Sequence, residues 1–258
     1  MIAQWRLFLL ALRYFTRIPV PPWVIRGKTR VDSAARFLPL VGAVVGAAGG
    51  AAYWGAAAFW PTSVAVVLSM LATMLITGAV HELGLADTCC LLSSAKPAEK
   101  PPDAKAANRL GSFGMLIVVF FLFTKYNALM ALSAASLVFA LPPTIGLGVI
   151  MIAAHTASRA LVVTAIAIQT PAPHGREAAR PHVSVGELCF ALLTGFLPAT
   201  LLGTAGLIGL AAAIVIRIAF VPYVKKYLGG YAADYLGATQ QLTEVGFYLG
   251  ALAAWTYF

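Results

Sequence analysis

Two uncharged stretches near the start of the chain decide the fold: LPLVGAVVGAAGGAAYWGAAAFW at 38–60 and SVAVVLSMLATMLITGAV at 63–80. Each approaches the ~20 apolar residues that a helix needs to cross the hydrocarbon core of a bilayer. Pro61 and Thr62 lie between them and predict a tight turn, so the two stretches form a helical hairpin. The whole chain agrees, because 60% of its 258 residues are hydrophobic and only 10% are charged. The composition therefore predicts an all-α, polytopic membrane protein and excludes a soluble domain.

Further apolar stretches extend this prediction to about seven transmembrane helices in a single membrane domain, residues 1–258. Pro198, with Gly203 and Gly206, divides a long run into two shorter helices that turn near 203–206. Glycines at every fourth position of the first span, Gly42, Gly46 and Gly50, predict close helix packing and are compatible with a homo-oligomer. The other predicted spans are 113–135, 144–168, 188–224 (as two helices) and 241–258.

The basic residues predict the orientation of the bundle. Four polar regions hold seven, four, two and three Lys or Arg, which together are 16 of the 18 in the chain. This asymmetry places all four regions, and the N-terminus, in the cytoplasm. No basic stripe with interleaved aromatics indicates nucleic-acid binding. The four regions are 1–37, 83–112, 169–187 and 217–240.

The N-terminal stretch 2–16 has Trp5, Phe8, Leu9, Leu12 and Phe15 on one helical face. A signal peptide is one interpretation of such a stretch. Its apolar core is short and no small-residue cleavage site follows it, so we favour an interfacial helix on the membrane surface.

Three polar motifs lie at the predicted cytoplasmic ends of spans: HELGLADTCC at 81–90, NRLGSFG at 108–114 and GGYAADYLGA at 229–238. The first brings an imidazole and two carboxylates to the point where a hydrophobic helix meets water. Glycine-rich turns expose backbone N–H groups to phosphate, and a neighbouring arginine adds a bidentate anion contact. Because carboxylates also hold Mg²⁺, the three motifs together indicate a site for a diphosphate-containing substrate. A solvated helix end capped by Gly84 is the simpler interpretation of the first motif.

The order of these motifs resembles the cobalamin-5′-phosphate synthases, also called adenosylcobinamide-GDP ribazoletransferases. FTRIPVP at 15–21 and RFLPLVG at 36–42 look like the entry motifs of that family. Residues 81–88 are similar to H-x-D-G-L-A-D-T, and RLGSFG at 109–114 is similar to R-x-G-x-F-G. AHTASRA at 154–160 looks like the S-R-A segment, and residues 229–238 are similar to G-G-Y-T-G-D-x-L-G-A. The resemblance covers nearly the whole chain.

The chain departs from the family pattern mainly at acidic positions. Leu83, Cys90 and Ala107 replace three of the aspartates of the family. Residues 91–108 also lack the apolar periodicity of a helix, and we expect a disordered loop there. Four further departures are Leu91, Asn108, Ala232 and Ala233.

The resemblance implies a reaction: α-ribazole, or its 5′-phosphate, is joined to adenosylcobinamide-GDP with release of GMP, at the bacterial inner membrane and with Mg²⁺ as cofactor. It implies catalytic roles for His81, Asp87 and Arg109, with His81 as a general base or as the residue that orients a carboxylate. Glu82, Asp87 and Asp234 are the predicted metal ligands. The predicted substrate contacts are Gly84, Gly111, Arg159, Gly229 and Gly230.

Three alternatives stay open at this point. The loss of carboxylates is compatible with a disabled homologue that binds corrinoid without turnover. A transporter would explain Lys125, His155, Arg159 and Glu244 within or near spans, since ionisable residues line substrate paths in carriers. These residues are equally explained if Lys125 and Arg159 pair with Glu244 or extend toward the interface. A phosphotransferase acting on CDP-alcohols is the third alternative, although its D-G-x-x-A-R motif is absent.

Overall fold

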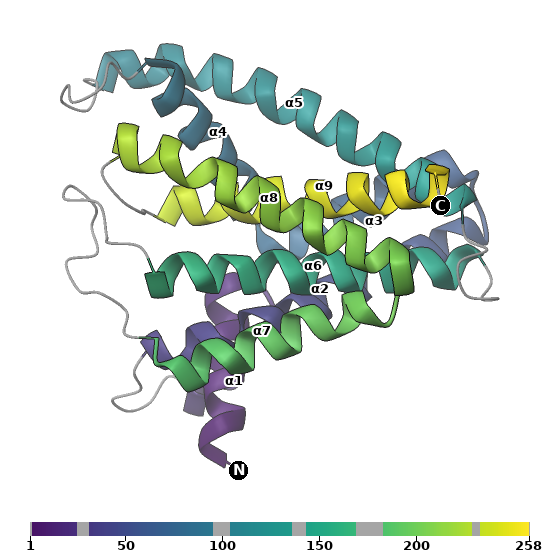
Figure 1. Ribbon diagram of the computed structural model, residues 1–258, viewed down its shortest axis with the longest axis horizontal. Coiled ribbons are helices and arrows are strands. Elements are labelled where there is room, and N and C mark those ends of the chain that lie inside the picture. Colours follow the sequence, from purple (N-terminus) through teal and green to yellow (C-terminus); the bar gives the residue numbers. More distant parts are fainter. Residues whose placement is uncertain are drawn as a thin grey trace.

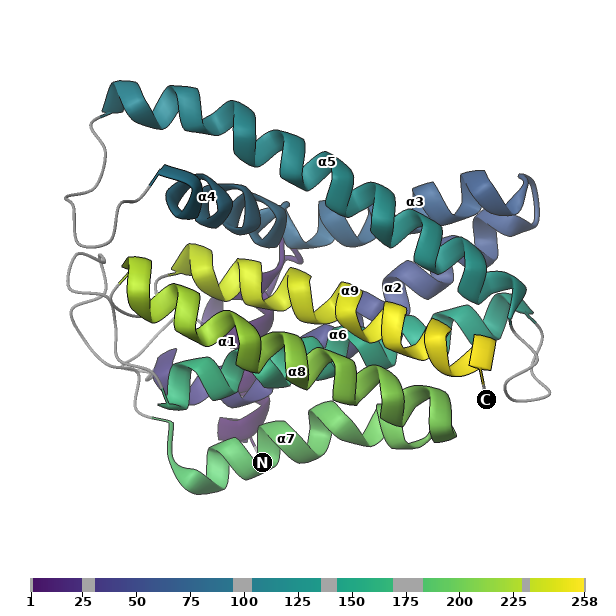
Figure 2. The same cartoon turned by 45° about the horizontal axis from the view of Figure 1, so that its top comes forward.

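The computed structural model describes residues 2–24, 31–94, 104–135, 143–168, 183–228 and 233–257, and within these ranges every regular element is a helix. This confirms the predicted all-α class. Most of the long helices run along one axis of the molecule, side by side (Figures 1 and 2). The elements are α1 (Ile2–Phe15), η1 (Pro22–Val24), η2 (Val31–Phe37), α2 (Leu38–Ala57), α3 (Thr62–Thr77), α4 (Val80–Ser94), α5 (Ala104–Ala134), α6 (Pro143–Ile168), α7 (Val185–Thr200), α8 (Gly203–Leu228) and α9 (Ala233–Tyr257).

The predicted hairpin is present as α2 and α3. Pro61 is the N-cap residue of α3, with extended backbone at ψ 153°, and the turn lies where the Pro61-Thr62 pair predicts it. The second predicted turn is also confirmed, because α7 ends at Thr200 and α8 begins at Gly203 with φ +61°. A positive φ is easily adopted only by glycine, which explains why the long apolar run divides at this residue.

A break that the sequence did not predict separates α3 from α4. Gly78 and Ala79 have φ of +71° and +58°, and the chain bends there by 86°. Gly78 ends α3 in the left-handed conformation that commonly terminates helices. Beyond the break α4 begins near the middle of the bundle and runs outward beside α5 (Figures 1 and 2).

Two predicted cytoplasmic loops contain more helix than expected. In region 83–112 the structure has α4 up to Ser94 and α5 from Ala104, so the described parts of 91–108 are helical and the prediction of a loop was wrong for them. In region 217–240, α8 continues to Leu228 and α9 begins at Ala233. Burial of Leu85 and Ala86 against neighbouring helices stabilises α4, because most helix stability in proteins comes from tertiary packing.

The most extensive helix contact among the described elements joins α2 to α6. A Cβ atom added to Gly46 would lie 2.7 Å from the Cα of Ile152, and one added to Gly50 would lie 2.7 Å from the Cα of Gly148. The glycine stripe of α2 therefore lets two backbones meet, as predicted. Small residues extend the contact along α6, where Ala153 and Ala157 are fully buried.

Four helices in the described ranges are long and apolar enough to cross a membrane, or five if the bent α3–α4 pair counts as one span. The predicted number of seven is therefore not confirmed, although the polytopic architecture is. The 25-residue α9 is absent from this set, in keeping with its polar residues Asp234, Gln240, Gln241 and Glu244.

One end of the bundle gathers the helix ends that flank the polar regions. We call it the basic end: α4, α6 and α8 end there, and α5, α7 and α9 begin there (Figures 1 and 2). The sequence segments that join these helix ends belong to the regions rich in Lys and Arg. The arrangement thus agrees with a single basic side.

Helix α1 crosses the direction of the other helices instead of joining them (Figure 1). Leu9 and Leu12 are buried in a cluster with residues of α2, whereas Trp5 and Tyr14 are exposed. An apolar face thus packs on the bundle and aromatic side chains remain outside. This orientation is compatible with the predicted interfacial helix.

Candidate active site

Helices α4 and α9 approach each other through two glycines. A Cβ atom on Gly84 would lie 2.6 Å from the carbonyl oxygen of Asp234, and one on Gly237 would lie 3.2 Å from the Cα of His81. Gly84 is therefore a packing residue within α4, and the predicted helix end at this position is not observed. The contact brings the first and third sequence motifs together.

The α4–α9 contact places two carboxylates opposite each other at the basic end. Asp87 and Asp234 are both exposed, and their charges interact. Neither forms an ion pair with another residue that the structure describes. Two like charges in proximity repel each other and favour a bound cation. We call these two residues the acidic pair.

Three positions at which the family pattern has aspartate lie on one face of α4. With 100° per residue, positions 83, 87 and 90 lie within about 60° of one another. Leu83 is 54% exposed, one helical turn before Asp87. Cys90 is buried, and its charge in the thiolate form would interact with Asp87. Aspartates at 83 and 90 would therefore join Asp87 in one acidic strip.

Glu82 points elsewhere. It is buried, and its Oε1 accepts a hydrogen bond of 2.9 Å from Nε2 of Gln241. The structure therefore does not bring Glu82 together with Asp87 and Asp234. No group of three or more His, Cys, Asp or Glu side chains among the described residues has an arrangement suited to a metal ion. The metal role of Glu82 stays a prediction, and the local geometry gives it no support.

Other predicted site residues fall at the limits of the described chain. Arg109 and Gly111 lie in the first turns of α5, which begins at the basic end beside the end of α4 (Figures 1 and 2). Gly229 and Gly230, predicted phosphate contacts, lie outside the described residues. Their roles stay predictions. His81 is at the start of α4, and its Nε2 is buried without a hydrogen-bond partner in the described part of the chain.

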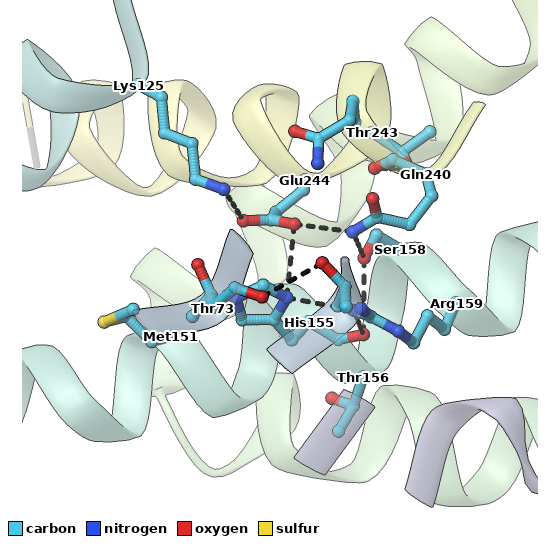
Figure 3. A network of polar contacts seen from close by, with 12 residues as sticks. Thr73, Lys125, Met151, His155, Thr156, Ser158, Arg159, Gln240, Thr243 and Glu244 are labelled. Carbon is cyan, nitrogen blue, oxygen red and sulfur yellow. Dashed lines mark hydrogen bonds and ion pairs between the residues drawn. The ribbon is translucent and has the colours of Figure 1, made fainter. Parts of the chain in front are cut away.

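Arg159 lies in the interior of the bundle, within the network shown in Figure 3. Its Nη1 is 2.9 Å from Nδ1 of His155 and donates to the carbonyl oxygen of His155 at 3.2 Å. Glu244 is fully buried, and its carboxylate contacts Lys125 Nζ at 2.6 Å and His155 Nδ1 at 3.2 Å. The predicted pairing of Lys125 with Glu244 is confirmed, whereas Arg159 contacts His155 instead. We call Lys125, His155, Arg159 and Glu244 the buried network.

Two glutamines that the sequence analysis did not select complete this interior. Gln240 donates to Glu244 and, at 3.3 Å, to the hydroxyl of Ser158, while Gln241 holds Glu82. The signal that would have identified them is their spacing from Glu244 along α9, which puts all three on adjoining helix faces. The predicted loop 217–240 ends at Gln240 and the predicted span 241–258 begins at Gln241, so the prediction divided this pattern between a loop and a helix.

Comparison with known proteins gives a consistent result. A sequence profile described as cobalamin-5-phosphate synthase matches residues 7–252. A protein of Leptothrix cholodnii named adenosylcobinamide-GDP ribazoletransferase is 38% identical over 98% of this chain and 97% of its own. Proteins of the same name from Ralstonia nicotianae (38% identical, 96% and 94% covered) and Shewanella oneidensis (34%, 93% and 90%) are also similar. No solved structure matches. A match of this extent establishes the family: the chain belongs to the cobalamin-5-phosphate synthases.

Proposed function

We propose that this chain is an adenosylcobinamide-GDP ribazoletransferase, which joins α-ribazole or its 5′-phosphate to adenosylcobinamide-GDP and releases GMP. The observation that carries the proposal is the family match over residues 7–252. Relatives named for this activity align with almost the entire chain, which supports it further. The acidic pair adds a location, because a charged diphosphate reaches the protein from water and is costly to place in the hydrocarbon core of the bilayer.

The reaction replaces one oxygen on phosphorus by another. A hydroxyl oxygen of the ribazole attacks the phosphorus that stays with the cobinamide, a new P–O bond forms, and the P–O bond to GMP breaks. GMP leaves with the electron pair of that bond, and the hydroxyl proton passes to a base. Asp87 is the predicted catalytic group that is exposed at the basic end, so it is better placed than the inward-facing His81 to receive this proton.

Mg²⁺ is the expected cofactor, and the acidic pair fits it in part. Asp87 and Asp234 supply carboxylate oxygens, which are the ligands that Mg²⁺ prefers, and Mg²⁺ commonly combines one or two carboxylates with substrate phosphates and water. When bound, the ion would neutralise charge on the phosphates. Arg109 would add a bidentate phosphate contact from α5.

Leu83 favours a second candidate, a homologue that has lost turnover. It occupies an exposed position on the strip that leads to Asp87, where the family pattern has an aspartate. Losing one group that stabilises charge in a transition state commonly costs about 10²-fold in rate. The loss at position 83 could therefore leave binding intact and remove most of the activity.

The deciding experiment measures GMP release from adenosylcobinamide-GDP and α-ribazole by the purified chain, with Mg²⁺ and with EDTA. Variants Leu83→Asp and Leu83→Asp/Cys90→Asp restore the acidic strip, and Ala107→Asp restores the third family position. Leu201→Asp is the matched control, because it adds the same charge at an exposed leucine between α7 and α8.

Mg²⁺-dependent release by the wild-type chain confirms the proposed activity. Release only by a restored variant, and not by Leu201→Asp, identifies a disabled member of the same family. If neither the wild-type nor any restored chain forms the product, the proposed function is wrong.

The location we propose is the bacterial inner membrane, with the basic end in the cytoplasm. The apolar helices and the family support a membrane protein, and the distribution of Lys and Arg supports the orientation. A cysteine placed at Ser184, just before α7, in a chain without its three native cysteines tests this. An impermeant maleimide should label it in inside-out vesicles and leave it unlabelled in intact spheroplasts.

A further inference from the structure

A small cavity lies inside the bundle at the level of the α3–α4 break. Polar side chains from α3, α4, α5, α6 and α9 line it. It leaves about 10 Å³ for the centre of a water molecule, which is room for about one water. Figure 3 shows part of its wall, the buried network.

Six buried side-chain atoms in the wall of this cavity have no hydrogen-bond partner among the described residues. Buried polar atoms destabilise the fold when they stay unsatisfied, so six around one cavity point to a ligand that contacts several of them. The atoms are His81 Nε2, Glu82 Oε2, His155 Nε2, Arg159 Nε, Gln240 Oε1 and Gln241 Oε1.

The charges of the wall indicate that this ligand is neutral. Lys125 and Arg159 bring two positive charges, and Glu82 and Glu244 bring two negative charges. They balance when both histidines are neutral. An added ion would leave an uncompensated charge in a buried site, which is strongly unfavourable.

The contacts of His155 assign its proton. Its Nδ1 lies 2.9 Å from Arg159 Nη1 and 3.2 Å from Glu244 Oε2. Nδ1 cannot accept from the first and donate to the second at the same time. The shorter contact is with a guanidinium, which only donates, so we assign the lone pair to Nδ1 and the proton to Nε2. Nε2–H is then a donor that faces the cavity.

Donors and acceptors therefore meet across the cavity. Arg159 Nε and His155 Nε2 donate, whereas Glu82 Oε2 and the two glutamine oxygens accept. Among the contacts of the described residues, no direct ion pair joins Arg159 to Glu82, although their charges interact. A group that both donates and accepts can bridge them.

We propose that the cavity is a binding site for one neutral hydrogen-bonding group, which bridges Glu82 of α4 to Arg159 of α6 and to the glutamines of α9. The group is a water molecule, or a hydroxyl or amide of a bound substrate that displaces this water. Binding of a substrate group rests on the proposed function, whereas binding of a water molecule does not. Because the break at Gly78–Ala79 directs Glu82 inward, the bridge also fixes the start of the helix that carries Asp87.

A structure of the wild-type chain in lipid nanodiscs, resolved well enough to show waters, tests this directly. An isolated density within hydrogen-bond distance of Glu82 Oε2 and Arg159 Nε, seen without substrates, supports a water. Density continuous with adenosylcobinamide-GDP or α-ribazole supports a substrate group. An empty cavity, or a density with the short oxygen contacts of a metal cation, overturns the proposal.

Thermal stability in different salts tests the neutrality of the ligand. The Tm of the wild-type chain should be the same in sodium chloride, potassium chloride and sodium gluconate at equal ionic strength. Glu82→Gln keeps the shape of the side chain but leaves one positive charge unbalanced, so its Tm should become higher in chloride than in gluconate. Glu187→Gln removes the same charge far from the cavity and should show no such difference.

A dependence of the wild-type Tm on sodium or potassium would overturn the proposal in favour of a cation site, and so would a Glu82→Gln chain without chloride dependence. If Glu82→Gln does not fold, the Tm of the wild-type chain in the different salts and the density in the cavity still decide whether the ligand is neutral. GMP release is measured on the same preparation. Absent release with the isolated density present rejects the proposed function alone, and release with an empty cavity rejects this site alone.

Discussion

The two carboxylate sites of this bundle differ in what surrounds them. Glu244 is fully buried, and Lys125, Gln240 and Tyr248 all donate to its carboxylate. Asp87 is exposed, and among the described residues the charge that acts on it is another carboxylate, that of Asp234. The protein supplies partners for the first site and a repelling neighbour for the second.

This difference indicates that the buried carboxylate serves the stability of the fold and the exposed carboxylates serve the reaction. A buried charge must be paired within the fold, because its desolvation costs several kcal/mol, so the partners of Glu244 are a requirement of folding. The acidic pair has no such requirement and gains from a cation or substrate that arrives from solution. We therefore expect substitutions in the buried network to change stability first and substitutions in the acidic pair to change activity first.

The largest effect should come from Lys125→Met. This change removes the cation 2.6 Å from Glu244 Oε1 and keeps most of the apolar side chain. Breaking a buried ion pair in this way costs about 3–5 kcal/mol, so the Tm in detergent should fall sharply. In the double variant Lys125→Met/Glu244→Gln no carboxylate is left without its cation, and the loss should be smaller. A single variant as stable as the wild-type chain would contradict the role given to the pair.

Asp87→Asn should change activity and leave stability almost unaltered, the opposite of the effect expected for Lys125→Met. Loss of the carboxylate should lower GMP release by about 10²-fold or more, while the Tm changes little because the side chain is exposed. The assay uses the wild-type chain, or the Leu83→Asp chain if only that one is active. Asp87→Glu should retain part of the activity. If Asp87→Asn lost stability and kept its rate, the division between the two sites would be wrong.

The helices of this fold were largely predictable from hydrophobic length. The predicted spans 38–60 and 144–168 differ from α2 and α6 by three residues or fewer at each end. Helix α4 was not predicted, because its first turns contain His81, Glu82 and Gly84 and resemble a polar boundary. Its stability comes from packing of Leu85 and Ala86 in the bundle, and a single sequence does not reveal which surface a short helix will meet.

The candidate site was predictable in part for a related reason. Asp87 and Asp234 were selected from their motifs, and the α4–α9 contact brings them together. Glu82 was assigned to the same site, although five residues along a helix separate it from Asp87 and the two side chains therefore point about 140° apart. Which of them faces inward depends on the break at Gly78–Ala79. Ala79 has positive φ, which the sequence does not signal because alanine rarely adopts it.

A medium effect is expected where α2 supports the buried network. A Cβ atom on Gly42 would lie 2.3 Å from the carbonyl oxygen of His155 and 2.9 Å from Cδ of Arg159. Gly42→Ala should therefore separate α2 from α6 and cost about 1–3 kcal/mol. Gly55→Ala, on the same helix with nothing within 4 Å, should be neutral or stabilise by up to about 1 kcal/mol through helix propensity. Equal Tm values for the two variants would show that the network tolerates a shift of α2.

The smallest effect should come from a partly buried carboxylate that has partners, Glu187 in the first turn of α7. Ser184 and Glu187 form a capping box, and Arg36 Nη1 lies 3.3 Å from Glu187 Oε1. Burial alone would raise the pKa of Glu187, but the hydrogen bonds from Ser184 and Ser33 and the charge of Arg36 outweigh it and lower the pKa below its ordinary value. The carboxylate thus contributes stability above the ordinary pKa of 4.5, and this contribution is lost as the pH falls through the lowered value.

Ser184→Ala removes the cap and should cost about 1 kcal/mol near neutral pH. Glu187→Gln should lose stability near pH 7 and show a flatter decline in Tm below the ordinary pKa than the wild-type chain, because the amide does not titrate. Measuring Tm between pH 3 and pH 7 for the three chains checks both expectations. A wild-type decline as flat as that of Glu187→Gln would mean that this carboxylate behaves like the acidic pair, exposed and without influence on folding. The division between the two kinds of carboxylate would then depend on burial alone and not on whether a partner is present.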